Sequence, residues 1–77
     1  MRIYVRNIHL NASENQLRDI FIQFGNVSDV KIHMNSYGKS LGFGYVVMND
    51  DLDGIDSIRE LNKINFMNQF LEIYRID

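Results

Sequence analysis

The spacing of apolar residues along this chain changes between a period of two residues, typical of strands, and a period near 3.6, typical of helices. From the N-terminus the periods follow the order strand, helix, strand, strand, helix, strand. This order is that of the ferredoxin-like split βαβ unit. We therefore predict an α+β, ferredoxin-like βαββαβ sandwich, with a four-stranded antiparallel sheet and two helices on one face. At 77 residues, the chain is expected to form a single domain spanning residues 1–77.

Capping and turn residues delimit the predicted elements. Ser13 and Gln16 form a capping box at the start of the first helix, and Gly25 is its expected C-terminal stop. Aspartates supply the N-cap and the first turn of the second helix, where the helix dipole favours them. The expected strands are 2–6, 27–34, 41–48 and 70–76, and the expected helices fall within 11–25 and 49–62.

The first strand indicates which face of the sheet is covered. Ile3 and Val5 alternate with Arg2, Tyr4 and Arg6, and successive side chains of a strand point to opposite faces. Because burying unpaired arginines is costly, Ile3 and Val5 must face the helices. Tyr4 then lies on an open sheet face between two arginines.

The third strand carries two aromatics that alternate with two glycines, in the run GFGYVV (42–47). Periodicity alone leaves its register open, because both of its faces hold apolar residues. In the register with Phe43 and Tyr45 on the open face, Val46 and Met48 fill the core side, where the two glycines add little bulk. We favour this register; its alternative is ordinary aromatic packing in the core.

Two segments resemble known motifs. IYVRNI (3–8) resembles the six-residue RNP motif of aliphatic, aromatic, aliphatic, any, Asn, aliphatic residues. LGFGYVVM (41–48) resembles the eight-residue RNP motif, K/R-G-F/Y-G/A-F-V-x-F/Y. With its element order and length, the chain resembles the RNA recognition motif family over essentially its whole length.

The resemblance implies a function in binding single-stranded RNA, with single-stranded DNA as a further ligand, through bases stacked on the open sheet face. At the matching positions the stacking residues are Tyr4, Phe43 and Tyr45, and Asn7 is a structural residue at the strand end. The alternative is that the three rings pack across strands beneath a covering partner. Contacts to phosphates or bases are expected from Arg2, Arg6, Lys31 and Lys39, with His33, Arg75, Glu72 and Tyr74 as further candidates.

Two departures from the family pattern remove positive charge. Leu41 stands where the family usually has Lys or Arg, and Asn68 and Gln69 stand where a Gly-Arg pair often precedes the last strand. The net charge is −2, and much of the acidity lies within residues 50–60. Because few cations remain, we expect weak to moderate RNA affinity with a shallow salt dependence, and the alternative for each basic residue is a solvated strand position.

Other functional classes find little support in the sequence. The chain has no cysteine, and His9 and His33 have no partners at metal-ligand spacing, so no metal or cofactor is expected. The sequence contains no Gly-rich phosphate loop and no nucleophile beside a base, so no feature of it suggests an enzyme. No signal peptide or membrane span is evident, which favours a cytoplasmic location. The short chain is similar to small bacterial members of the family.

The alternative function is a protein-interaction module that binds a peptide or partner through its helical face. Ile22 and Ile55 fall off the main apolar helix faces, beside an acidic second helix. Some domains of this fold bind a peptide tryptophan with an Arg-x-Phe loop; here Phe66 follows Lys-Ile-Asn, so the arginine is missing. A weak homodimer through the helices is also left open.

Overall fold

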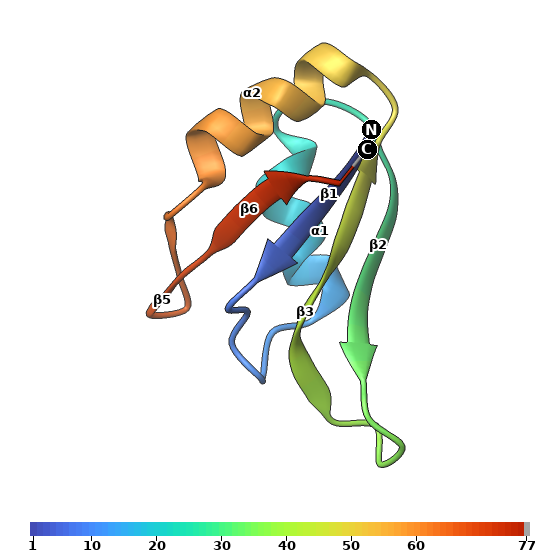
Figure 1. Ribbon diagram of the computed structural model, residues 1–77, viewed down its shortest axis with the longest axis vertical. Helices are drawn as coiled ribbons and strands as arrows, with labels where there is room; N and C mark the ends of the chain where they lie inside the picture. The colour runs from blue at the N-terminus through green and yellow to red at the C-terminus, as the bar shows by residue number, and fades with distance from the viewer. Residues whose placement is uncertain (77) are drawn as a thin grey trace.

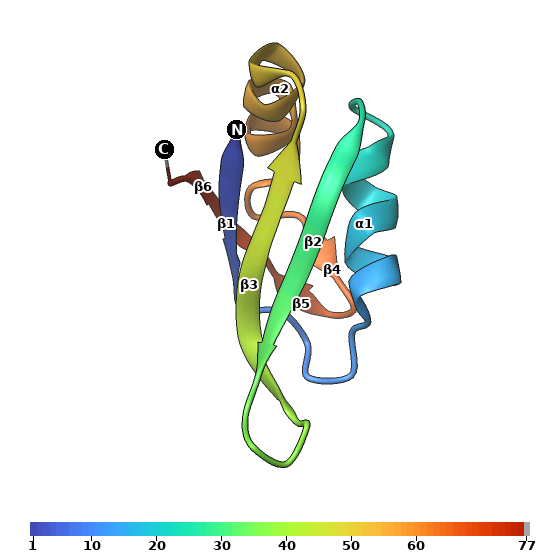
Figure 2. The same cartoon turned by 90° about the vertical axis from the view of Figure 1, so that its right-hand side faces the viewer.

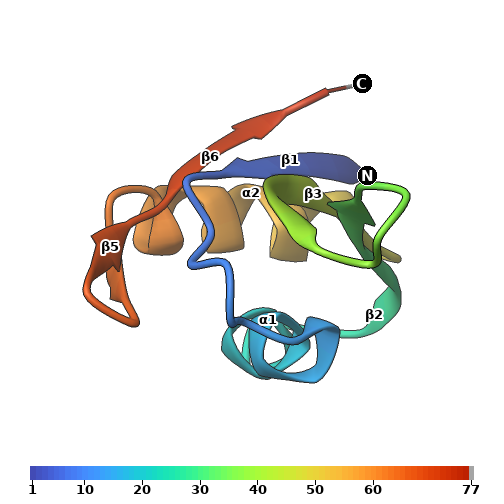
Figure 3. The same ribbon diagram turned by 90° about the horizontal axis from the view of Figure 1, so that it is seen from below.

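The computed structural model describes residues 1–76 as two layers, a four-stranded antiparallel sheet and two helices on one of its faces (Figures 1 and 3). The strand order is β2-β3-β1-β6, which places the two strands carrying the RNP-like motifs at the centre. The α+β, ferredoxin-like sandwich is thereby confirmed. The elements are β1 (Arg2–Arg6), α1 (Glu14–Ile22), β2 (Val27–Met34), β3 (Ser40–Met48), α2 (Asp51–Leu61), β4 (Asn65–Phe66), β5 (Gln69–Phe70) and β6 (Glu72–Arg75).

Helix α1 begins at the predicted capping box. The Ser13 hydroxyl accepts a hydrogen bond from the Gln16 amide at 3.0 Å, and the Gln16 side chain accepts one from the Ser13 amide at 2.9 Å. The helix ends at Ile22, earlier than the stop expected at Gly25. The Gly25 amide donates to the Ile22 carbonyl at 3.3 Å, so a tighter turn with bonds between residues three apart ends the helix first.

Helix α2 packs its small residues against the sheet. Asp50 is its N-cap, as expected, and its carboxylate accepts two amide hydrogen bonds from the first turn. Gly54, Ser57 and Leu61 are buried, and two of these three residues are small. A Cβ at Gly54 would lie 2.5 Å from the sulfur of Met1, so the absence of a side chain allows this close approach to the N-terminus.

The core lies between the sheet and the helices. Ile3 and Val5 of β1 are fully buried, and so are Val46 and Met48 of β3. This arrangement confirms both the orientation of β1 and the register that places Phe43 and Tyr45 on the open face. The other buried apolar side chains are Ile8, Ala12, Leu17, Phe21, Val30, Ile32, Leu61, Leu71 and Ile73.

The pairing of β2 with β3 contains an irregularity that the alternating pattern did not predict. Ile32 pairs with Gly44, but Met34 pairs with Ser40. Between these two pairs β3 advances by four residues while β2 advances by two. Gly42 lies within this slip with a φ of +78°, a conformation that favours glycine. Gly42 therefore leaves the regular alternation expected to align it with Gly44 on the helix side.

A small hairpin occupies the segment before the last strand. The expected strand 70–76 is shorter, because Phe70 belongs to β5 and pairs with Asn65 of β4. The two residues between β4 and β5, Met67 and Asn68, have φ values of +54° and +68°. Two consecutive positive φ values are those of a two-residue hairpin turn with the twist that strands require.

Candidate nucleic-acid interface

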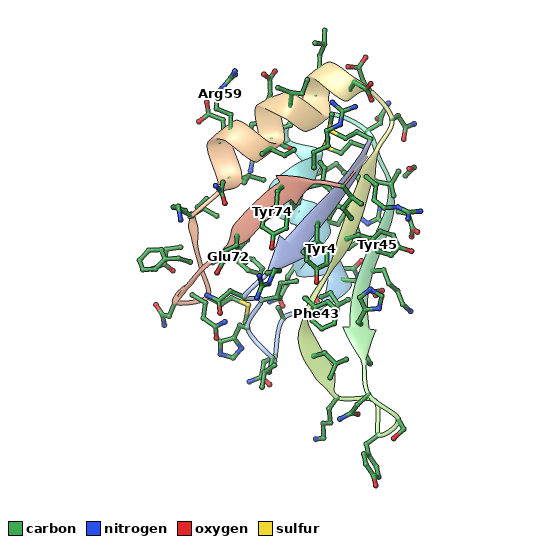
Figure 4. All side chains as sticks on the ribbon, in the orientation of Figure 1. Tyr4, Phe43, Tyr45, Arg59, Glu72 and Tyr74 are labelled. Carbon is green, nitrogen blue, oxygen red and sulfur yellow. The ribbon has the colours of Figure 1, made fainter. Side chains whose placement is uncertain are left out.

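Side chains from all four strands form regular rows on the open face of the sheet (Figure 4). Its central row runs across all four strands, because Lys31 pairs with Tyr45, Tyr45 with Tyr4, and Tyr4 with Tyr74. The strand register thus brings together two of the expected stacking rings, one expected cation and a third tyrosine.

A second row lies beside the first. Arg6 of β1 pairs with Phe43 of β3 on one side and with Glu72 of β6 on the other. On the opposite side of the central row, two residues before Tyr4 on β1, Arg2 pairs with Val47 of β3. Two of the expected cations therefore flank the central row of rings.

The rings form one connected cluster. The centroid of Tyr4 lies 6.1 Å from that of Phe43 and 5.5 Å from that of Tyr74, with interplanar angles of 57° and 45°. These are tilted contacts within the range preferred by aromatic pairs. Tyr74 is 40% exposed and the other two rings are half-buried, so the cluster is supported from below and accessible from solvent.

His33 extends this cluster onto β2. Its ring centroid lies 5.1 Å from that of Phe43 and 6.1 Å from that of Tyr45. From the sequence His33 was only one of several candidate contacts, without an aromatic role. Its alternation with Lys31 on the polar face of β2 was the available signal, because residues two apart share a face.

Tyr45 is held by charged groups on both sides. The Arg2 guanidinium carbon lies 5.1 Å from the Tyr45 ring centroid, within the range of a cation–π contact. The Tyr45 hydroxyl donates a hydrogen bond to the Asp29 carboxylate at 3.3 Å. These contacts restrict the Tyr45 ring and place one positive and one negative charge beside it.

Arg6 is similarly tied to the last strand. Its guanidinium donates to the Tyr74 hydroxyl oxygen at 3.3 Å. This hydrogen bond and the nearby Glu72 carboxylate raise the pKa of Arg6 above its ordinary value. Arg6, like any arginine, is positively charged, and it lies at a solvent-exposed position next to the rings.

Lys39 lies apart from these rows. It is exposed in the β2–β3 loop, which projects beyond the end of the sheet (Figures 1 and 2). Asn35 closes this loop, because its side-chain oxygen accepts the amides of Tyr37 and Lys39 at 2.9 and 3.0 Å. Of the five Arg and Lys residues proposed from the sequence, the sheet face thus collects Arg2, Arg6 and Lys31. Arg75 instead lies 3.8 Å from the Asp51 carboxylate of α2.

A pocket of about 300 Å³ opens next to the second row, at the end of β1 and the start of β3. Leu41 lines it with Arg6 and Phe43 and is 47% exposed, so an apolar side chain is presented where the resemblance leads one to expect a cation. Asn7 also lines it, with a φ of +61°, and its side-chain Nδ2 donates a hydrogen bond to the Phe70 carbonyl at 2.9 Å. Asn7 therefore links the end of β1 to the hairpin, which is the structural role expected of it.

Two other features are absent from residues 1–76. No helix in this range is long and apolar enough to cross a membrane. Within the same residues, no three histidine, cysteine, aspartate or glutamate side chains gather closely enough to hold a metal ion. The aromatic face brings together aromatic and charged side chains from all four strands.

Comparison with known proteins relates the chain to one family. The family model described as RNA recognition motif matches residues 3–72. The chain is 37% identical over 73 residues to a "Polyadenylate-binding protein, cytoplasmic and nuclear" of Chaetomium globosum, covering 95% of this chain and 9% of that protein. It is 35% identical over 72 residues to "Protein boule-like" of Mus musculus, covering 94% of this chain and 25% of that protein. These relatives are eukaryotic, so they give no support to the bacterial placement.

Solved structures show the same fold. The chain matches the crystal structure of "RNA Binding Protein PG1" with a TM-score of 0.93 and 32% identity, over 96% of this chain and 90% of that one. It also matches a structure described as "SXL-LETHAL PROTEIN/RNA COMPLEX" with a TM-score of 0.94 and 21% identity, over 99% of this chain and 46% of that one. At that identity the second likeness concerns the fold alone.

Proposed function

This chain belongs to the RNA recognition motif family, and on that premise we propose that it binds single-stranded RNA on the open face of its sheet. Members of this family are binding domains, and the chain is not an enzyme. The observation that carries the proposal is the connected, accessible cluster in which Tyr4 contacts Phe43 and Tyr74, and His33 links Phe43 to Tyr45. The proposal takes residues 1–77 as one binding domain.

Stacking of bases on these rings is the proposed source of affinity. Every nucleobase has a π-face, and each base–aromatic stack contributes about 1–3 kcal/mol by alanine substitution. Tyr4 and Phe43 stack successive bases, with Tyr45 and Tyr74 on either side of Tyr4 in its row. An open sheet suits this role because it receives unpaired, splayed bases that a duplex would keep hidden.

Phosphate contacts contribute less to the proposed RNA affinity than base stacking does. Arg2, Arg6 and Lys31 border the rings, and Lys39 reaches the bound RNA from the β2–β3 loop. Glu72, on the same face, repels phosphate. Neutralising a phosphate of a single strand contributes about 0.7 to the slope of log affinity against log salt, so a few contacts produce a shallow slope.

Single-stranded DNA is proposed as a second ligand. The stacking rings contact bases, which the two nucleic acids largely share, whereas the 2′-hydroxyl distinguishes RNA at particular positions. A cytoplasmic location also remains a proposal, supported by the relative named "Polyadenylate-binding protein, cytoplasmic and nuclear". The chain spans less than a tenth of that relative, whose other functions are not transferred to it.

An NMR titration of the protein with short, unstructured single-stranded RNA tests the proposal. Backbone amides of β1 and β3 are expected to shift, while those on the outer faces of α1 and α2 remain in place. A parallel titration with a tryptophan-containing peptide tests the helical-face alternative. Ile22 and Ile55 are exposed there, but Phe66 is half-buried against the core, which disfavours it as a peptide contact. Shifts confined to the helices with peptide, and none with RNA, would reverse the assignment.

A further inference from the structure

Glu72 is a carboxylate on the aromatic face that lies near Arg6 without forming an ion pair with it. Leu71 and Ile73 are buried beneath the sheet, so Glu72 and Tyr74 point to the open side of β6 (Figure 4). Within residues 1–76 the Glu72 carboxylate accepts no hydrogen bond and forms no ion pair within 4.0 Å. Its position opposite Arg6 and next to Tyr74 places it beside the surface proposed to stack bases.

The chemistry of a carboxylate restricts what it can recognise in RNA. An ionised carboxylate only accepts hydrogen bonds, and it repels the phosphate backbone. Base edges supply the donors: cytosine, adenine and guanine each carry an exocyclic amino group, whereas the single Watson–Crick donor of uracil, N3–H, lies between two carbonyl oxygens. Glu and Asp accordingly accept hydrogen bonds from the cytosine amino group in known nucleic-acid interfaces.

We propose that Glu72 makes this surface selective for bases that carry an exocyclic amino group, and against uracil. The selectivity rests on the proposed RNA binding and refines it. A base stacked on Tyr4 or Tyr74 turns its Watson–Crick edge toward β6, and its amino group donates to the Glu72 carboxylate. Arg6, paired opposite Glu72, supplies a donor for the neighbouring ring nitrogen or carbonyl oxygen of the same edge.

Cytosine and uracil separate this role from a simple charge effect. The two pyrimidines have the same ring size, and they differ at the 3 and 4 positions, where the hydrogen-bonding pattern is reversed. A carboxylate that only repelled phosphate would weaken binding of both RNAs equally. A carboxylate that accepts from the base amino group changes the ratio of the two affinities.

The test measures binding of fluorescent oligocytidylate and oligouridylate of equal length by anisotropy. For the wild-type protein we expect a preference for cytosine of about tenfold, the size of one good base contact. Glu72→Gln carries both a donor and an acceptor and so complements either base; the ratio should fall toward one, mainly because uridylate binds better. Glu72→Ala should remove the preference as well. Glu60→Gln removes the same charge from the exposed side of α2 and should leave the ratio unchanged.

Three results overturn the inference. A wild-type protein that binds both RNAs with equal affinity would exclude the selectivity while leaving the proposed RNA binding in place. A cytosine preference that persists in Glu72→Gln and Glu72→Ala would assign it to another residue. A wild-type protein that binds neither RNA, with its fold confirmed by its amide spectrum, would remove the proposed function itself.

Discussion

Tyr4 and Tyr74 face each other across β1 and β6, paired in register with ring centroids 5.5 Å apart. This contact joins the last strand to the aromatic cluster that the RNP-like motifs alone would confine to the two central strands. Arg6 holds the Tyr74 hydroxyl from the same strand as Tyr4. The edge strand thus contributes a positioned ring to the face.

Replacing Tyr74 with alanine should weaken RNA binding by about 1–3 kcal/mol, the contribution of one base–aromatic stack. Because the side chain is 40% exposed, the midpoint of urea unfolding should change little. Phe70→Ala is the matched control, since Phe70 is 63% exposed on β5, outside the aromatic cluster. Equal RNA affinities for wild type and Tyr74→Ala would exclude the edge strand from the interface.

The double variant Phe43→Ala with Tyr45→Ala should abolish RNA binding while the fold persists. Both rings lie on the open face, whereas the alternating residues Val46 and Met48 fill the core. The amide spectrum should retain the dispersion of the folded protein, and anisotropy should detect no complex. Loss of the folded spectrum would instead mean that these rings stabilise the sheet as core residues do.

Leu41→Lys should raise RNA affinity and steepen its salt dependence. The side chain lies at the edge of the aromatic face, beside Arg6 and Phe43, where a cation can reach a phosphate. The slope of log affinity against log salt should increase by about 0.7. Leu52→Lys, at a 71% exposed position on α2, adds the same charge as a control. An identical slope change in both variants would indicate a net-charge effect.

Gly44→Ala should destabilise the fold by about 1–3 kcal/mol, the usual cost of forcing atoms into a packed site. A Cβ at this position would collide with the carbonyl oxygen of Lys31 on the neighbouring strand. Urea unfolding measures the effect. Ser28→Ala, a control on β2 at an exposed position, should have a smaller one. An unchanged unfolding midpoint for Gly44→Ala would mean that the strands separate without cost.

Local patterns were enough to predict most of the fold. The alternation of Ile3 and Val5 with arginines specified which face of β1 is buried, because an unpaired buried charge is unfavourable. The capping box at Ser13 specified the start of α1. Both signals act between residues close in sequence, and for that reason they can be read without the tertiary structure.

The rest depends on pairing between distant segments. The slip between β2 and β3 around Gly42 is a relationship between two strands, and periodicity within either strand does not reveal it. The hydrogen bond from Arg6 to Tyr74 joins residues 68 positions apart. The cation–π contact of Arg2 with Tyr45 depends on strand register and on the side-chain conformations chosen once the strands pair.

The ring protons of the aromatic cluster provide the most direct test of base stacking. In an NMR titration with single-stranded RNA, ring protons of Tyr4, Phe43 and Tyr45 should shift upfield, because a stacked base shields them. The ring of Phe21, which is fully buried on α1, should keep its resonances and serves as an internal reference. Unchanged ring resonances for the three face residues at saturating RNA would contradict the account.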